Sequence, residues 1–324
     1  MEITKIITRR TNFIFGFLCL YPVLSFIVSI PAFVPNIAEA VGVDSLSLMQ
    51  QLKFYFGFAI PQFLYPVLSL LIILAVPHFI NFKVKDLIPT SKVPVFNYIV
   101  IIFMFLGIST VATYIVNYII YLMEKIGFQI PSMEDYFTKP VGIIQTIIFF
   151  IVITVLPAFC EEFIYRGVLM NSLKPLNSTM AVFISAIAFG LMHGTVQQIP
   201  FAFVMGLLFG YLSIKYNSII LPIVLHFINN SIASVFLLLE QSLDENLFSN
   251  ISSFFDISII ILGLISTFIF FYKIGIKHKL QSSISNGKAF GSVFKSIFFW
   301  IFVVVYLGIM LLNILLPLII SAIQ

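Results

Sequence analysis

Long apolar segments, separated by short stretches with charged and turn-forming residues, recur along the whole chain. About 20 apolar residues are enough for a helix to cross a bilayer, and lipid satisfies no backbone hydrogen bonds, so each segment is expected to be helical. The pattern predicts nine helices, at residues 12–35, 54–80, 95–123, 141–171, 179–195, 199–214, 219–239, 256–273 and 296–322. The expected fold class is an all-α, polytopic membrane bundle.

The composition excludes a soluble protein. Of 324 residues, 60% are hydrophobic and 9% are charged, whereas soluble domains carry about 25% charged residues. Membrane lipid is an expected partner because of this apolar composition. Nucleic acid is not expected, since the chain has no nucleic-acid-binding pattern and no Gly-rich phosphate loop. Cys19 and Cys160 both lie in apolar segments, so no disulfide framework is implied.

Basic residues are unevenly distributed over the predicted connections. If the N-terminus is cytoplasmic, fourteen of the seventeen basic residues fall on the inside, and only Lys53, Lys125 and Lys139 fall on the outside. Most acidic residues fall on the outside. Cytoplasmic loops carry an excess of Lys and Arg, so we expect a multi-pass protein of the cell membrane with its N-terminus in the cytoplasm.

Strongly polar side chains interrupt the predicted helices at four places, which are Glu161 and Glu162 with Arg166, then His193, then His226, and then Asn230. Ionisable groups inside a membrane span are costly, and a functional site is their default interpretation. The structural alternative is a buried ion pair with hydrogen bonds that hold helices together. Four such places on three helices favour function.

Helical spacing separates the roles of the two glutamates. Glu162 and Arg166 are four residues apart and share a helix face, so they can pair. Glu161 has no basic residue three or four positions away. We therefore interpret Glu162 as the partner of Arg166 and Glu161 as a free carboxylate, which suits a general base.

Two histidines supply further candidates. His226 and Asn230 are four residues apart, and two donors on one helix face can stabilise an oxyanion. His193 follows Phe189 by four residues, so the aromatic ring can pack under the imidazole; plain helix packing is the alternative interpretation of His193. Counted from the cytoplasmic helix ends, all these side chains lie near the middle of the bilayer. We expect them to meet in one buried cavity.

The pattern Glu161-Glu162-x-x-x-Arg166, Phe189-x-x-x-His193 and His226-x-x-x-Asn230 resembles the three motifs of the CPBP family, the CAAX prenyl protease and bacteriocin-processing proteins, also called Abi proteins. The resemblance covers about residues 140–240. It implies a CPBP catalytic core at 140–240, preceded by N-terminal transmembrane helices at 1–139 and followed by C-terminal transmembrane helices at 241–324.

The resemblance implies an intramembrane endopeptidase that hydrolyses a peptide bond in a hydrophobic or lipidated, CAAX-like peptide or membrane-protein substrate. Glu161 and His193 would activate a water, His226 and Asn230 would bind the oxyanion, and Glu162 and Arg166 would support the site. Glu161, His193 and His226 would also make a His₂Glu zinc set, although the HExxH helix typical of such sites is absent. The favoured interpretation is a glutamate-type enzyme with no metal and no cofactor.

Two other functions stay open. A non-catalytic membrane adaptor or bacteriocin-immunity factor would bind a partner membrane protein, but a scaffold has little need for ionisable groups at mid-membrane. A transporter with Glu161 as an ion site is the other, but no inverted repeat or pair of broken helices supports it.

Overall fold

The computed structural model describes residues 2–33, 51–80, 82–132, 140–275, 280 and 282–323. Its elements are all helical: α1 (Glu2–Leu18), α2 (Leu20–Ser29), η1 (Ile30–Phe33), η2 (Lys53–Ala59), α5 (Ile60–Gln62), α6 (Leu64–Phe79), α7 (Val84–Leu87), α8 (Val95–Lys125), α9 (Gly142–Phe150), η4 (Ile151–Val155), α10 (Leu156–Glu162), η5 (Phe163–Met170), α11 (Asn171–Leu173), α12 (Ser178–Leu191), α13 (Gln198–Tyr216), α14 (Ile220–Ser242), α15 (Glu245–Ile269), η6 (Phe270–Ile274), α16 (Asn286–Val293) and α17 (Ile297–Ile323).

Eight helices of the described chain are long and apolar enough to cross a membrane, and each matches one of the nine predicted segments. The ninth match is α12, an apolar helix of 14 residues, which spans about 21 Å at 1.5 Å per residue. The predicted helical bundle is therefore confirmed, with one helix shorter than a bilayer core of about 30 Å.

Two helix starts differ clearly from the prediction. The first helix begins at Glu2 and not at residue 12, and the eighth begins at Glu245 and not at residue 256. In the eighth helix, Asp244 accepts a hydrogen bond from Leu247 N at 2.9 Å and caps the helix. Hydropathy marks only the apolar part of a helix, whereas capping and packing also fix its polar turns. The end of the first predicted helix, residues 34–35, lies outside the described residues.

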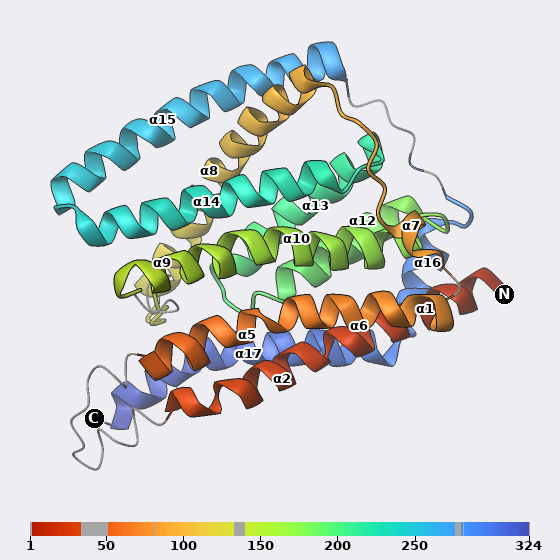
Figure 1. Ribbon diagram of the computed structural model, residues 1–324, viewed down its shortest axis with the longest axis horizontal. Coiled ribbons are helices and arrows are strands. Elements are labelled where there is room, and N and C mark those ends of the chain that lie inside the picture. The colour runs from red at the N-terminus through yellow and green to blue at the C-terminus, as the bar shows by residue number, and fades with distance from the viewer. Residues whose placement is uncertain are drawn as a thin grey trace.

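The helices form three groups (Figure 1). The first group is α8 packed along α15. The second group is the long central helix that runs from α9 to α11, together with α12, α13 and α14. The third group contains α1, α2, α5, α6 and α17, and the second lies between the other two. Within the bundle α10 contacts α6 of the third group, while α13 and α14 contact α8 of the first, so the central group touches both of the others.

The predicted cytoplasmic segments gather at one end of the bundle. The N-terminus, α7 and α16 lie together at the right in Figure 1, and α1 contacts both α16 and α11. This end carries exposed Lys83, Lys85, Lys288 and Lys295. Lys139, one of the three basic residues expected at the other end, lies outside the described residues, as do Lys277 and Lys279.

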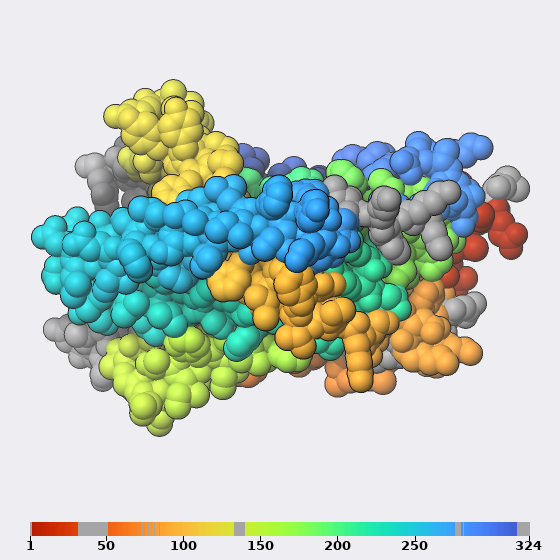
Figure 2. Space-filling view, turned by 90° about the horizontal axis from the view of Figure 1, so that it is seen from above, coloured from red at the N-terminus to blue at the C-terminus, as the bar shows by residue number. Residues whose placement is uncertain are grey.

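The outer face of α15 is apolar. Figure 2 shows α15 lying across the face of the molecule that is seen from above. Its side chains Phe254, Leu264 and Phe268 are 76%, 67% and 70% exposed. A row of exposed aromatic and aliphatic side chains on one helix is expected where the neighbour is lipid and not water.

The opposite face of α15 meets α8 at two glycines. A Cβ placed on Gly107 would lie 2.7 Å from Gly263 Cα, and one placed on Gly263 would lie 2.6 Å from Gly107 Cα. Both distances are shorter than a non-bonded carbon contact. Small residues allow such close approach, and helices in lipid associate through this packing because lipid is as apolar as their side chains.

Substitution of Gly107 by Ala is expected to destabilise the protein by about 1–3 kcal/mol, because the added methyl group separates α8 from α15. Thermal unfolding of the purified protein in detergent measures the effect. Gly308→Ala in α17 is the matched control, since a Cβ there meets no described atom within 4 Å. Equal unfolding temperatures for the two variants would contradict the close packing.

Candidate active site

The central helix is continuous from Gly142 to Leu173 and contains two π-helical segments. The α-helical segment α10 lies between two π-helical segments, η4 and η5. π-helical turns are rare and occur often at functional sites. Glu161 and Glu162 end α10, and Arg166 lies in the following π-segment, so the charged residues occupy a locally rewound part of the helix.

Glu162 and Arg166 form the ion pair that their spacing predicts. Arg166 Nη1 donates to Glu162 Oε1 at 2.8 Å, and both side chains have no exposed surface. Arg166 Nη2 also donates to Gly206 O at 3.4 Å. A buried charge is stable only if it is paired and hydrogen-bonded. The pair meets this condition through Glu162 Oε1 and both Arg166 Nη atoms, whereas Glu162 Oε2 and Arg166 Nε have no hydrogen-bond partner among the described residues.

Two phenylalanines hold the Arg166 guanidinium. Its Cζ lies 4.2 Å from the Phe189 ring centre and 5.1 Å from that of Phe209. Both distances fall within the range of cation–π attraction. Phe189 comes from α12 and Phe209 from α13, so the arginine also joins three helices.

His226 lies beside both glutamates. Its Nδ1 is 3.0 Å from Glu162 Oε1, and its Nε2 is 3.9 Å from Glu161 Oε2. Since Glu162 Oε1 also accepts from Arg166, one oxygen binds both groups. The ring stacks on Phe209 at a centroid distance of 5.8 Å. His226 and Glu161 are each 5% exposed, so this contact takes place in the protein interior.

The charges of this cluster require one more proton for neutrality. Two carboxylates and one guanidinium leave a net charge of −1 when His226 is neutral. Burying an unbalanced charge is costly. Glu161 Oε2 is buried and has no hydrogen-bond partner among the described residues. This agrees with the prediction of a free carboxylate next to a paired one.

His193 joins the cluster through an aromatic ring. It follows the C-terminal end of α12, because the helix ends at Leu191 and Gly194 adopts a positive φ of 66°. The predicted helix over residues 179–195 is thus too long, since left-handed glycine backbone ends helices. Phe189 packs edge-on against the His193 ring at 5.2 Å, as predicted, and also against His226 at 5.7 Å.

The tautomer of His193 follows from its hydrogen bond. His193 Nδ1 lies 2.8 Å from Phe189 O. A carbonyl oxygen can only accept, so Nδ1 carries the hydrogen and Nε2 of the neutral ring keeps a lone pair. Nε2 is therefore the ring atom able to accept a proton.

Asn230 has a structural partner that the sequence did not predict. Its Nδ2 donates to Ile153 O at 2.9 Å. Pro157, four residues after Ile153, has no N–H to donate to this carbonyl. Asn230 therefore satisfies a backbone group that the proline leaves free inside the bundle. Its Oδ1 accepts from Asn229 Nδ2 at 3.3 Å, so the amide is fixed on both sides.

Glu161, His193 and His226 are the three residues that the sequence offered as a zinc set. Over the whole described part of the chain, no group of three His, Cys, Asp or Glu side chains is arranged to hold a metal ion. The three candidate ligands belong to the described residues, and His226 Nδ1 is already bonded to Glu162.

Several residues near the site belong to no motif. Phe209 was missed because an apolar residue on an apolar helix gives no signal. Four tyrosines from other positions, Tyr21, Tyr65, Tyr165 and Tyr306, lie close enough to Glu161 to interact with its charge. Tyr165 could be noticed from the sequence because it follows Glu161 by four residues, whereas the other three were marked only by their placement inside predicted spans.

The last helix also reaches the site. Asn313 Nδ2 in α17 donates to Gly194 O at 3.0 Å, directly after His193. Ile309 of the same helix packs against Gly194. The loop that carries His193 is therefore held by a helix far from it in sequence.

Residues 143–232 match the family model described as Type II CAAX prenyl endopeptidase Rce1-like. Comparisons with curated proteins and with solved structures find no match. The matched segment contains Glu161, Glu162, Arg166, His193, His226 and Asn230, which are the residues of all three motifs. This segment of the chain is therefore similar to a family of CAAX prenyl endopeptidases.

Proposed function

We propose that this protein is an intramembrane glutamate-type endopeptidase of the cell membrane, with its N-terminus in the cytoplasm, that cleaves a hydrophobic or lipidated, CAAX-like peptide. The observation that carries the proposal is the pair of buried atoms Glu161 Oε2 and His226 Nε2, 3.9 Å apart. This separation is too long for a direct hydrogen bond, so both side chains can act on a bound substrate or water. The match of residues 143–232 to a protease family supports the same function.

In the proposed reaction Glu161 removes a proton from a water as the water oxygen bonds to the scissile carbonyl carbon. The carbonyl oxygen becomes an oxyanion, and protonated His226 donates to it through Nε2. Glu161 then passes its proton to the peptide nitrogen, and the C–N bond breaks. The products are a carboxyl group and a free amine, so atoms and charges balance.

The neighbours of these two residues have positioning roles in the proposal. Glu162 accepts from His226 Nδ1 at 3.0 Å, which orients the ring and stabilises its protonated form, as a carboxylate does for a catalytic histidine. Arg166 holds Glu162 in place. Asn230 fixes the helix that carries His226 against Ile153, and its second amide hydrogen is a further donor for the oxyanion.

His193 is proposed to assist Glu161 through its Nε2 lone pair. It stands in a motif of its own, at the end of α12, and the Phe189 ring lies between it and His226. The Asn313 contact to Gly194 keeps the loop in position. In this proposal a shift of the loop after α12 would move His193, which assists the general base. It would leave His226, the donor to the oxyanion, in place.

Cleavage of a labelled library of farnesylated and unmodified peptides by the purified full-length protein tests the proposal. Cleavage is expected to persist in excess chelator and to fall by about 10²-fold or more in His193→Ala and His226→Ala. Loss of cleavage under chelation, restored by added zinc, would replace the glutamate mechanism with a metal-dependent one. If no peptide is cleaved while the protein is folded, the adaptor function takes its place.

A further inference from the structure

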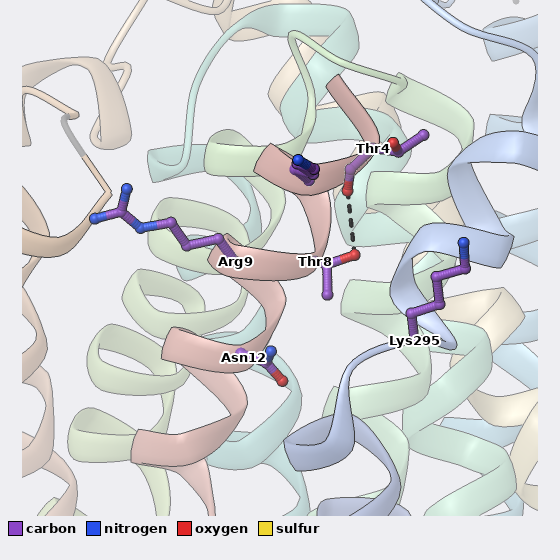
Figure 3. A pocket seen from close by; sticks show the side chains of 6 residues that line it. Thr4, Thr8, Arg9, Asn12 and Lys295 are labelled. Carbon is purple, nitrogen blue, oxygen red and sulfur yellow. Dashed lines mark hydrogen bonds between the residues drawn. The ribbon is translucent and has the colours of Figure 1, made fainter. Parts of the chain in front are cut away.

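A second polar site lies at the end of the bundle that holds the N-terminus. It is a pocket of about 540 Å³ between the first three turns of α1 and the turn that joins α16 to α17, and it is drawn in Figure 3. Its size falls in the range of about 300–1,000 Å³ that is usual for small-ligand sites. The residues that line it are Thr4, Lys5, Thr8, Arg9, Asn12 and Lys295.

Hydrogen bonds fix the wall of the pocket. Thr8 Oγ1 donates to Ser292 O at 2.8 Å. Asn12 Oδ1 accepts from Ser296 Oγ at 2.7 Å, and Ser296 Oγ in turn accepts from Phe299 N at 3.1 Å. Because Asn12 Oδ1 accepts the bond from Ser296, the Asn12 amide N–H groups are the atoms that can donate to a ligand. The two sides of the pocket are thus locked together before any ligand binds.

The lining carries positive charge without compensation. Lys5, Arg9 and Lys295 supply three cations, no Asp or Glu lines the pocket, and none of the three forms an ion pair with a described residue. Figure 3 shows Thr8 between Lys295 and Arg9, with Lys295 on one side of α1 and Arg9 extending on the other. Lys295 therefore lies beside the pocket on one side of α1, while Arg9 extends the positive surface on the other.

Aromatic residues place this pocket at the level of lipid headgroups. Trp300, five residues after Lys295, is 48% exposed, and its Nε1 donates to Phe294 O at 2.8 Å. Phe294 is 46% exposed. Tryptophan with a satisfied N–H and an exposed ring is typical of the boundary between membrane and water. Lysines at this depth attract anionic phospholipids.

We propose that this pocket binds a phosphate group, supplied by the headgroup of an anionic membrane lipid or by a soluble phosphate. Two lysines provide charge, and the Asn12 amide can donate to the phosphate oxygens. The site lies on α1 and α16–α17, outside the segment that matches the protease family. It stands independently of the proposed peptidase activity.

Trp300 makes the proposal directly measurable, because it is the only tryptophan of the chain. The full-length protein is reconstituted in phosphatidylcholine vesicles that contain phosphatidylglycerol, with bromine on the acyl chains of one lipid or the other. Brominated phosphatidylglycerol is expected to quench Trp300 more strongly than brominated phosphatidylcholine at equal mole fraction. The double variant Lys5→Gln/Lys295→Gln is expected to lower this preference about tenfold.

Lys288→Gln is the matched control, because Lys288 is exposed on α16 and does not line the pocket. It should keep the preference for the anionic lipid, and thermal unfolding in detergent should show that all variants are folded. An unchanged preference in the double variant would overturn the proposal. An equal loss in Lys288→Gln would also overturn it, since general surface charge would then explain binding.

A final arm identifies the source of the phosphate. Inorganic phosphate or glycerol phosphate is added at constant ionic strength, with chloride as the reference anion. Displacement of phosphatidylglycerol from wild type shows that soluble phosphate uses the same pocket. Persistence of the lipid preference, together with its loss in the double variant, assigns the pocket to the lipid headgroup.

Discussion

Replacement of Glu161 by glutamine is expected to lower peptide cleavage by about 10²–10⁴-fold while the protein still inserts and folds. A general base contributes about this factor, and glutamine keeps the shape of the side chain but cannot accept the proton. Folding should be spared because Glu161 Oε2 makes no hydrogen bond within the described structure. Initial rates on a cleaved peptide from the library, measured at saturating substrate, give the effect on kcat.

Glu124→Gln serves as the control, since Glu124 is exposed near the end of α8 and the substitution is the same. It should leave both cleavage and unfolding temperature unchanged. Full cleavage by folded Glu161→Gln would remove Glu161 from the mechanism and end the glutamate-protease proposal.

Replacement of Glu162 by leucine is expected to destabilise the protein by about 3–5 kcal/mol, which is the usual cost of leaving one charge of a buried pair without its partner. Arg166 would lose its ion pair at 2.8 Å, and His226 Nδ1 would lose its acceptor at 3.0 Å. A large fall in unfolding temperature in detergent, with loss of cleavage, is the expected result. The adjacent variant Glu161→Leu breaks no such hydrogen bond and should be clearly more stable than Glu162→Leu.

The double variant Glu162→Leu/Arg166→Met separates the ion pair from the catalytic contribution. Removing both charges leaves neither member of the ion pair without its partner, and apolar replacement of a buried pair is often neutral or stabilising. Stability should therefore recover relative to Glu162→Leu, whereas cleavage should stay low because His226 still lacks its carboxylate. Recovery of cleavage in the double variant would show that Glu162 does not orient His226.

Sequence alone determined the membrane class, the nine apolar segments and the contacts within one helix. Glu162 and Arg166 are four residues apart in one helix, and helical geometry brings such pairs together wherever the helix lies. Phe189 and His193 have the same spacing and are also in contact, although α12 ends at Leu191. The motifs also identified the region that matches the protease family.

Contacts between helices were decided by the tertiary structure. The shared oxygen of Glu162, the Phe209 ring over His226, the bond from Asn230 to Ile153 and the hold of Asn313 on Gly194 each join residues distant in sequence. In a soluble helix the apolar face shows which side is buried. In lipid both sides are apolar, so hydropathy does not show how each helix is rotated, and only packing determines which side chains meet.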